Sequence, residues 1–148
     1  MESVNIREVN VQYGKATDYS AITSADGVVG FLRKIAPNNS QEHLIALYLD
    51  GKHAPIGYSV VCTGLANSCM VHPREVFQRA VLLGACAVVM AHNHPSGSAV
   101  RSREDDKVTQ DIAAAGRVLG IKLLDHIIFT DSEYFSYQST GKLEEVCR

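Results

Sequence analysis

The chain has 148 residues, of which 46% are hydrophobic and 20% are charged, a balance that is typical of one folded domain and excludes a disordered chain. Its net charge of −2 excludes a general polyanion-binding protein, so any contact with nucleic acid would need a local basic patch. The apolar runs all fall short of the roughly 18 residues of a membrane span, and we expect a single domain over residues 1–148 with no membrane partner.

The N-terminal part of the chain predicts a strand and then a helix. Apolar and polar residues alternate over 6–13, which indicates a strand within an N-terminal extension of residues 1–23. Ser24 is a suitable N-cap for the helix that follows, and Pro37 ends it. The apolar residues of this helix recur at helical spacing: Val28, Val29, Leu32 and Ile35.

A β-hairpin is expected next. Residues 43–49 are mostly apolar and indicate a strand, and Asp50-Gly51 is a strong hairpin turn signal. The return strand is expected over 56–63, with a shorter strand over 68–71.

The second half of the chain alternates helices with strands. Pro73 suits the first turn of a helix that continues to Gly84, and the apolar run 85–91 is typical of a strand buried on both faces. A helix is expected over 102–118, followed by strands over 122–130 and 134–138. This order predicts an α/β domain with a mixed sheet flanked by helices.

The cysteines and the N-terminal residues bear on the cellular compartment of the protein. The four cysteines form no CxxC pair, which argues against a disulfide framework or a zinc ribbon, and most lie in or beside apolar stretches as small buried residues do. The chain does not begin with the basic and then apolar order of a secretory signal. We therefore expect a cytoplasmic protein.

Two histidines end the most apolar strand. His92 and His94 are offset by two residues, so an extended backbone directs both imidazoles to the same face. They lie at the carboxyl end of the strand, where α/β proteins usually place their sites. A pair of surface histidines is the alternative interpretation.

A carboxylate follows on the next helix. Asp105 shares a helical face with apolar residues from Val108 onward, so it points inward, where a buried carboxylate needs a strong partner. Ser102-x-x-Asp105 is also close to a capping box, which is the alternative role for Asp105. Two histidines and one carboxylate together are the ligand set of a catalytic zinc site, although Fe²⁺ is compatible with the same ligands.

These motifs resemble a known family. His92-x-His94-Pro95 followed by Ser102-x-x-Asp105 resembles the JAMM signature of the JAB/MPN metalloprotease superfamily. Over about residues 24–142, the chain is similar to the RadC-like JAB domain of bacteria. That wider similarity rests on four strings, which are HPREVF at 72–77, HNHPSG at 92–97, SRED at 102–105 and LLDHII at 123–128.

The resemblance implies a JAB/MPN (cytidine-deaminase-like) fold and one Zn²⁺ bound by His92, His94, Asp105 and water. It also implies an upstream glutamate as general base, for which Glu42 at the start of a strand is the best candidate. Ser102 would then donate a hydrogen bond to the developing oxyanion. Other candidates for the base, Glu75 and Glu104, lie in helical segments that look solvated, and an ordinary strand-edge carboxylate is the alternative role for Glu42.

The chain departs from the RadC pattern in two places. RadC proteins commonly continue the metal-site turn with Asp-Pro-Thr-Pro, whereas this chain has Ser98-Ala99-Val100-Arg101, none of which is an expected ligand. RadC proteins also carry an N-terminal helical region of DNA-binding type, which we expect to be missing here. We therefore give the DNA repair association of the family little weight.

Three classes of function remain open. A JAMM-type peptidase or isopeptidase, with a peptide or protein substrate, is favoured by the resemblance. The second class is a metal-dependent nuclease, in which Arg101 and Arg103 beside the metal could hold phosphate, or a DNA-repair-associated protein. A non-catalytic partner-binding module is disfavoured by the intact ligand set. His126, within an apolar strand, is expected to be a core histidine, with contact to a metal ligand as the less favoured alternative.

Overall fold

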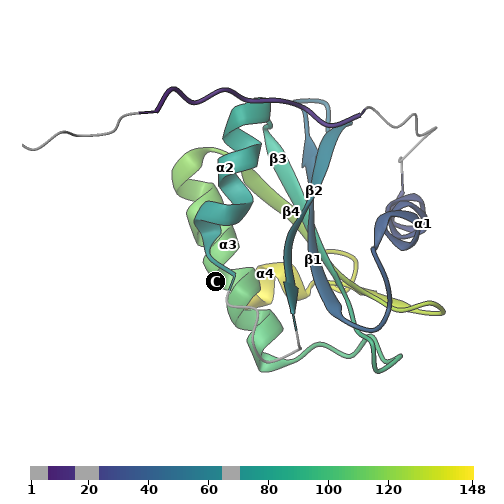
Figure 1. The fold of residues 1–148 in the computed structure, drawn as a ribbon. Coiled ribbons are helices and arrows are strands. Elements are labelled where there is room, and N and C mark those ends of the chain that lie inside the picture. Colours follow the sequence, from purple (N-terminus) through teal and green to yellow (C-terminus); the bar gives the residue numbers. More distant parts are fainter. Residues whose placement is uncertain (1–6, 16–23, 65–70) are drawn as a thin grey trace, which may run out of the picture.

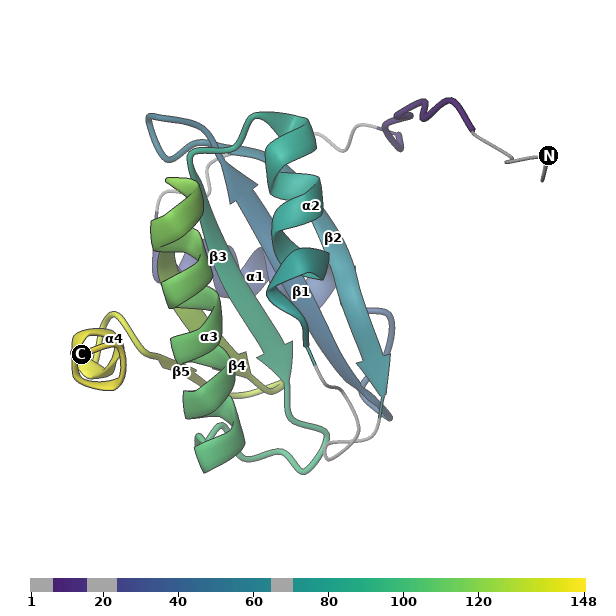
Figure 2. The same cartoon turned by 90° about the vertical axis from the view of Figure 1, so that its left-hand side faces the viewer.

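The computed structural model describes residues 7–15, 24–64 and 71–148. Figure 1 shows a sheet at its centre, and the strand order is β2-β1-β3-β4-β5 (Figure 2). Strands β3 and β4 run parallel, whereas β1 is antiparallel to both β2 and β3, and β5 is antiparallel to β4. The predicted α/β architecture with a mixed sheet is therefore confirmed. The strands are β1 (Glu42–Leu49), β2 (Pro55–Gly64), β3 (Ala87–Asn93), β4 (Lys122–Phe129) and β5 (Tyr134–Ser136).

Helices cover both faces of this sheet. Figures 1 and 2 show α1 on one face and α2 and α3 side by side on the other. The helices are α1 (Ala25–Ile35), α2 (Pro73–Leu83), α3 (Arg103–Leu119) and α4 (Lys142–Val146). In the described part of the chain, none of them has both the length and the apolar character that crossing a membrane requires.

The central strand β3 is buried along its whole length. Successive side chains of a strand point to opposite faces, so β3 contributes to two cores. Met90 packs in the core beneath α2 and α3, whereas Val89 and Ala91 pack with Val29 and Leu32 of α1. This explains why 85–91 is apolar at every position rather than at every second one.

The ends of the helices follow the expected capping chemistry. Ser24 accepts a hydrogen bond from the amide of Gly27, and Ser102 accepts one from the amide of Asp105. Helices α2 and α3 end at Gly84 and Gly120, with φ values of 66° and 71° that glycine adopts without strain. The helix boundaries predicted from these residues are thus confirmed to within one or two positions.

The predicted N-terminal strand is wrong for the residues that the structure describes. Residues 7–13 form no strand and are exposed, with Val9 at 84% and Tyr13 at 68% exposure. Alternation makes a segment suitable for a strand, but a strand also needs a hydrogen-bonded partner edge, which these residues lack. Most of the short strand expected over 68–71 lies outside the described residues.

The cysteines also differ from the expectation. Cys62 on β2 is disulfide-bonded, although the spacing argued against a disulfide framework. Cys86 is a free and exposed thiol rather than the small core residue that its apolar neighbours suggested. Cys147 is free and half-buried, and it packs against the core. Helix α4, with five residues after Gly141, was not predicted because so short a segment carries no periodic pattern.

Candidate metal centre

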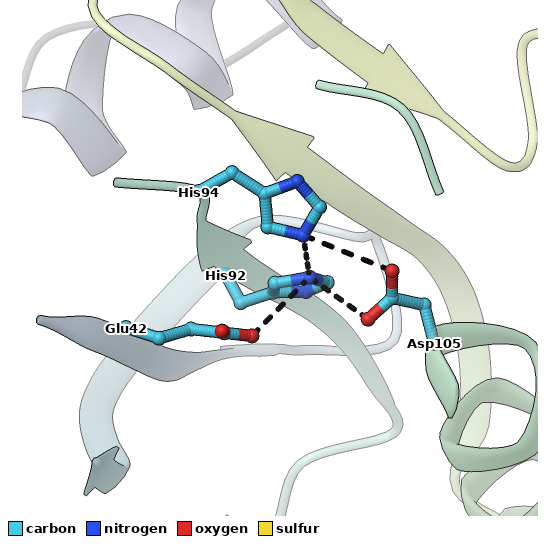
Figure 3. A group of neighbouring side chains, drawn as sticks. All are labelled: Glu42, His92, His94 and Asp105. Atoms are coloured by element: carbon cyan, nitrogen blue, oxygen red, sulfur yellow. Dashed lines mark hydrogen bonds and ion pairs between the residues drawn. The ribbon is translucent and has the colours of Figure 1, made fainter. Parts of the chain in front are cut away.

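Four predicted site residues from three elements meet at one end of the sheet. Glu42 begins β1, His92 lies near the end of β3, His94 follows that strand, and Asp105 is in the first turn of α3 (Figure 3). The antiparallel register pairs Leu44 with His92, which brings the start of β1 beside the end of β3. One potential ligand atom from each residue lies within 4.8 Å of all the others, so the cluster can hold a metal ion.

Imidazole nitrogens and carboxylate oxygens face one another across this cluster. His92 Nε2 lies 2.9 Å from His94 Nε2, 3.1 Å from Asp105 Oδ1 and 3.6 Å from Glu42 Oε1. His94 Nε2 lies 3.7 Å from Asp105 Oδ2. The side chain of His92 is almost fully buried, whereas those of Glu42 and His94 keep part of their surface exposed. The cluster therefore lies at the edge of the core, where solvent can reach it.

The hydrogen bond to His94 establishes how its ring is oriented. Nδ1 of His94 lies 2.8 Å from the carbonyl oxygen of Ser98, and a carbonyl can only accept. Nδ1 therefore carries the proton, and in the neutral ring the lone pair of Nε2 is directed at the cluster. Lone pairs of nitrogens and carboxylate oxygens at such distances repel unless a proton or a cation lies among them. The donor set thus fits a divalent cation of the zinc type.

The pKa values of the two carboxylates, Glu42 and Asp105, are shifted in opposite directions. Burial raises the pKa of Glu42 above its ordinary value, and the opposing effect of His92 and His94 does not cancel this increase. Burial also opposes ionisation of Asp105, but contacts with His92 and with Ser102 outweigh it and lower the pKa of Asp105. Asp105 is therefore the ionised group of the pair, whereas Glu42 is better suited to accept and release a proton.

Asp105 takes part in a capping box and also faces the two histidines. Ser102 N–H donates to Asp105 Oδ2 at 2.7 Å, and the amide of Asp105 donates to Ser102 Oγ at 3.1 Å, which completes a capping box. The other carboxylate oxygen, Oδ1, faces His92. Because Ser102 Oγ is an acceptor in the box, the hydroxyl proton is available to another group, and the side chain is exposed.

The remaining charged candidates make other contacts or are exposed. Glu75 is used in the capping box of α2, and Glu104 is exposed in the first turn of α3. Arg101 forms an ion pair with Asp106, and Arg103 is exposed. The structure therefore brings Glu42, but neither rival glutamate, to the two histidines.

Three polar residues that support the cluster were not among the predicted site residues. The carbonyl of Ser98 accepts a hydrogen bond from Nδ1 of His94. Oγ1 of buried Thr109 lies 2.7 Å from Nδ1 of His126. The side chain of Asn93 accepts from the amide of His43 at 2.7 Å and donates to the carbonyl of Gln41 at 2.8 Å. These last two bonds hold the backbone on both sides of Glu42. His126 is the buried core histidine that was expected, and it also contacts His92 at 2.8 Å.

A comparison with protein families identifies this arrangement. The model of the RadC-like JAB domain matches residues 22–142. The chain belongs to the RadC-like JAB domain family. The matched range contains the whole sheet, α1 to α3 and all four residues of the cluster, and the fold is that expected of a JAB/MPN domain.

Similar curated proteins carry the name UPF0758 protein. That of Geobacillus thermodenitrificans is 46% identical over 102 residues, which cover 69% of this chain and 45% of the relative. That of Methanococcoides burtonii is 42% identical over 120 residues, which cover 81% of this chain and 52% of the relative. The chain thus spans about half the length of these RadC-family relatives. That of Chlorobium chlorochromatii is 33% identical over 145 residues, 97% of this chain and 65% of the relative.

Proposed function

We propose that this RadC-like JAB domain is a zinc-dependent hydrolase that cleaves an amide bond in a peptide or protein substrate. The observation that carries the proposal is the convergence of His92, His94 and Asp105 with the lone pair of His94 directed inward. Three protein ligands that leave a further position open are typical of catalytic zinc, whereas structural zinc sites are closed and usually contain cysteine.

The residues of the chain have separate roles in this reaction. A zinc ion held by His92, His94 and Asp105 would supply a Lewis acid for the scissile carbonyl and lower the pKa of a bound water. Glu42 accepts a proton from the attacking water and delivers it to the nitrogen of the leaving amine. Its raised pKa supports both steps, because a carboxylate of ordinary pKa would be a weaker base and a poorer carrier of the proton.

Ser102 and Asn93 support the same chemistry in different ways. The exposed hydroxyl of Ser102 donates to the carbonyl oxygen as negative charge develops on it. Asn93 holds the two peptide groups that flank Glu42, so the carboxylate keeps its position relative to the histidines. An amide needs no further cation, which agrees with the use of Arg101 in an ion pair with Asp106.

The direct experiment is cleavage of labelled pools of peptides, isopeptide-linked peptides and single-stranded DNA by the zinc-loaded protein. We expect new amino termini from the amide pools, with a loss of about 10²-fold or more in Glu42→Gln, the scale of a positioned general base. Glu104→Gln is the matched control, because Glu104 is exposed and lies outside the cluster, and it should keep full activity.

Cleavage of DNA instead of the amide pools would contradict the proposal. Cleavage of DNA alone, weakening steeply with salt and disappearing in an Arg101→Ala/Arg103→Ala double variant, would replace the peptidase with a nuclease. Equal activity of Glu42→Gln and the unmodified chain would remove Glu42 from the reaction.

A further inference from the structure

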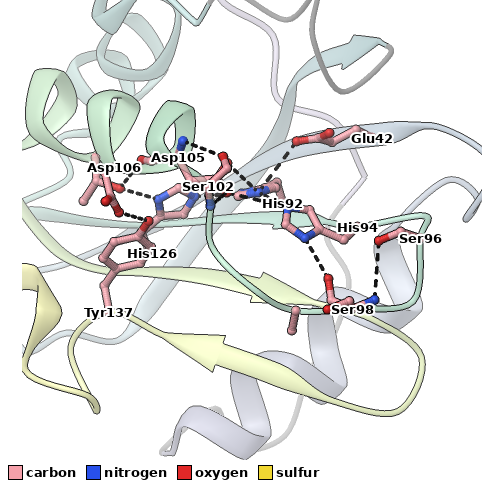
Figure 4. A network of polar contacts seen from close by, with 12 residues as sticks. Glu42, His92, His94, Ser96, Ser98, Ser102, Asp105, Asp106, His126 and Tyr137 are labelled. Carbon is pink, nitrogen blue, oxygen red and sulfur yellow. Dashed lines mark hydrogen bonds and ion pairs between the residues drawn. The ribbon is translucent and has the colours of Figure 1, made fainter.

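Two buried polar residues lie behind the candidate metal centre and are not used by the proposed reaction. His126 on β4 is 1% exposed and Thr109 on α3 is 0% exposed. The parallel register pairs His126 with Met90, two residues before His92 and on the same face of the sheet. Thr109 lies one helical turn after Asp105 on the inward face of α3. Hydrogen bonds join His92 to His126, His126 to Thr109, and Thr109 to the backbone of Asp105, so these four residues form a continuous row. Figure 4 shows His126 next to His92 in this row.

We infer that Thr109 and His126 are positioning residues, which fix His92 in the tautomer whose Nε2 lone pair faces the metal. This inference rests on the proposed metal centre, since it concerns how one of its ligands is prepared. It follows from the direction of three successive hydrogen bonds.

The first bond sets the direction of the others. The hydroxyl of Thr109 donates to the backbone carbonyl of Asp105 at 2.7 Å, and a hydroxyl has only one proton. Thr109 Oγ1 must therefore accept in its second contact, at 2.7 Å from Nδ1 of His126. Nδ1 of His126 carries the proton of that ring.

The proton position on His126 then determines which atom donates in its hydrogen bond with His92. His126 is enclosed in the core, and its Nε2 faces the ring of His92. A neutral ring that is protonated at Nδ1 has a lone pair at Nε2, which must accept from Nδ1–H of His92 at 2.8 Å. Nε2 of His92, which faces Asp105 and His94, is then the nitrogen that is left to bind the metal.

Packing keeps the intermediate ring from turning. The rings of His126 and Tyr137 are stacked, with centroids 5.2 Å apart and an angle of 7° between their planes. The hydroxyl of Tyr137 donates to Asp106 at 2.8 Å, which anchors that ring to the first turns of α3. Asp105 contributes its carboxylate to the cluster and its backbone carbonyl to this row, so the two ligands His92 and Asp105 are oriented by one network.

The first test is the tautomer itself, which requires no substitution. Long-range ¹H–¹⁵N correlation spectra of the metal-free protein should show His92 and His94 protonated at Nδ1. In Thr109→Val, which replaces the hydroxyl with a methyl group of similar size, His92 should show both tautomers. An Nε2-protonated, neutral His92 in the unmodified protein would overturn the inference.

The second test is zinc affinity, measured by competition with a chelator. Thr109→Val and His126→Phe should bind zinc about 10- to 100-fold more weakly, the usual cost of removing a group that orients a ligand. Thr109→Ser keeps the hydroxyl and should restore both the tautomer and the affinity. Unchanged affinity in a folded Thr109→Val protein would contradict the inference.

A matched control separates this effect from the loss of any threonine–histidine contact. Thr63 Oγ1 lies 2.8 Å from Nδ1 of His43. The side chain of His43 is on the same face of β1 as that of Ile45, which packs in the core beneath α1. Thr63→Val should leave the zinc affinity and the His92 tautomer unchanged. If the unmodified protein binds no zinc, the proposed function fails, whereas the tautomer spectrum still decides whether this row of hydrogen bonds orients His92.

Discussion

At the scale of single residues, Asp105 combines two interactions that one substitution can separate. In metal-free Asp105→Asn, the amide oxygen can still accept from Ser102 N–H, so the free energy of unfolding should differ from that of the metal-free unmodified protein by less than about 1 kcal/mol. The negative charge is lost, and zinc affinity should fall on the order of 100-fold. Chelator competition and urea unfolding measure the two effects.

The reciprocal variant is Ser102→Ala. It removes the acceptor for the amide of Asp105 and should lower the free energy of unfolding by about 1 kcal/mol while zinc affinity is retained. If Asp105→Asn bound zinc as tightly as the unmodified chain, Asp105 would be a cap alone.

The residues of the centre differ in how far the sequence could identify them. His92, His94 and Asp105 could be identified from the sequence because they form local patterns. These patterns are an HxH pair at the end of an apolar strand and an aspartate on an apolar helical face. Glu42 required the family resemblance, because a carboxylate at a strand start has no distinctive spacing. The contact of Thr109 with His126 depends on the register of β3 and β4, which local spacing does not encode.

At the scale of elements, α3 must approach α2 and the loop before β4 closely to place Asp105 and Thr109. A Cβ atom on Gly116 would lie 2.3 Å from the backbone oxygen of Ile121 and 3.1 Å from Phe77. We therefore expect Gly116→Ala to destabilise the fold by about 1–3 kcal/mol, despite the higher helix propensity of alanine. Chemical denaturation measures this change.

Gly30 in α1 provides the matched comparison. A Cβ atom there has no neighbour within 4 Å, so Gly30→Ala should stabilise the protein by about 0.5–1 kcal/mol through helix propensity alone. Stabilisation by both alanines would mean that α3 does not pack as closely as the structure has it.

The elements also show where sequence patterns fail. Helices α1, α2 and α3 begin and end at caps that are local in sequence, and all three were predicted near their true bounds. Strand formation depends on a partner elsewhere in the chain, and residues 7–13 have the alternation without the partner. Burial on both faces was predictable for β3 because its residues 87–91 are all apolar.

At the scale of the whole molecule, the centre joins β1, β3 and α3, so metal binding should stabilise the fold. Zinc at 100 times its dissociation constant should raise the free energy of unfolding by about 2.7 kcal/mol, because it binds the folded state. Thermal unfolding with and without zinc measures this linkage. In His94→Ala most of the increase should disappear, and an equal increase in that variant would place the zinc elsewhere.

The central claim is tested most directly by the zinc content of protein purified without chelator. Elemental analysis should find about one zinc per chain in the unmodified protein and a sharp loss in His92→Ala, His94→Ala and Asp105→Ala, because three ligands leave no redundancy. His53→Ala is the control, since His53 is exposed and lies outside the cluster, and it should keep its zinc. Full zinc content in all three ligand variants would contradict the assignment of this metal centre.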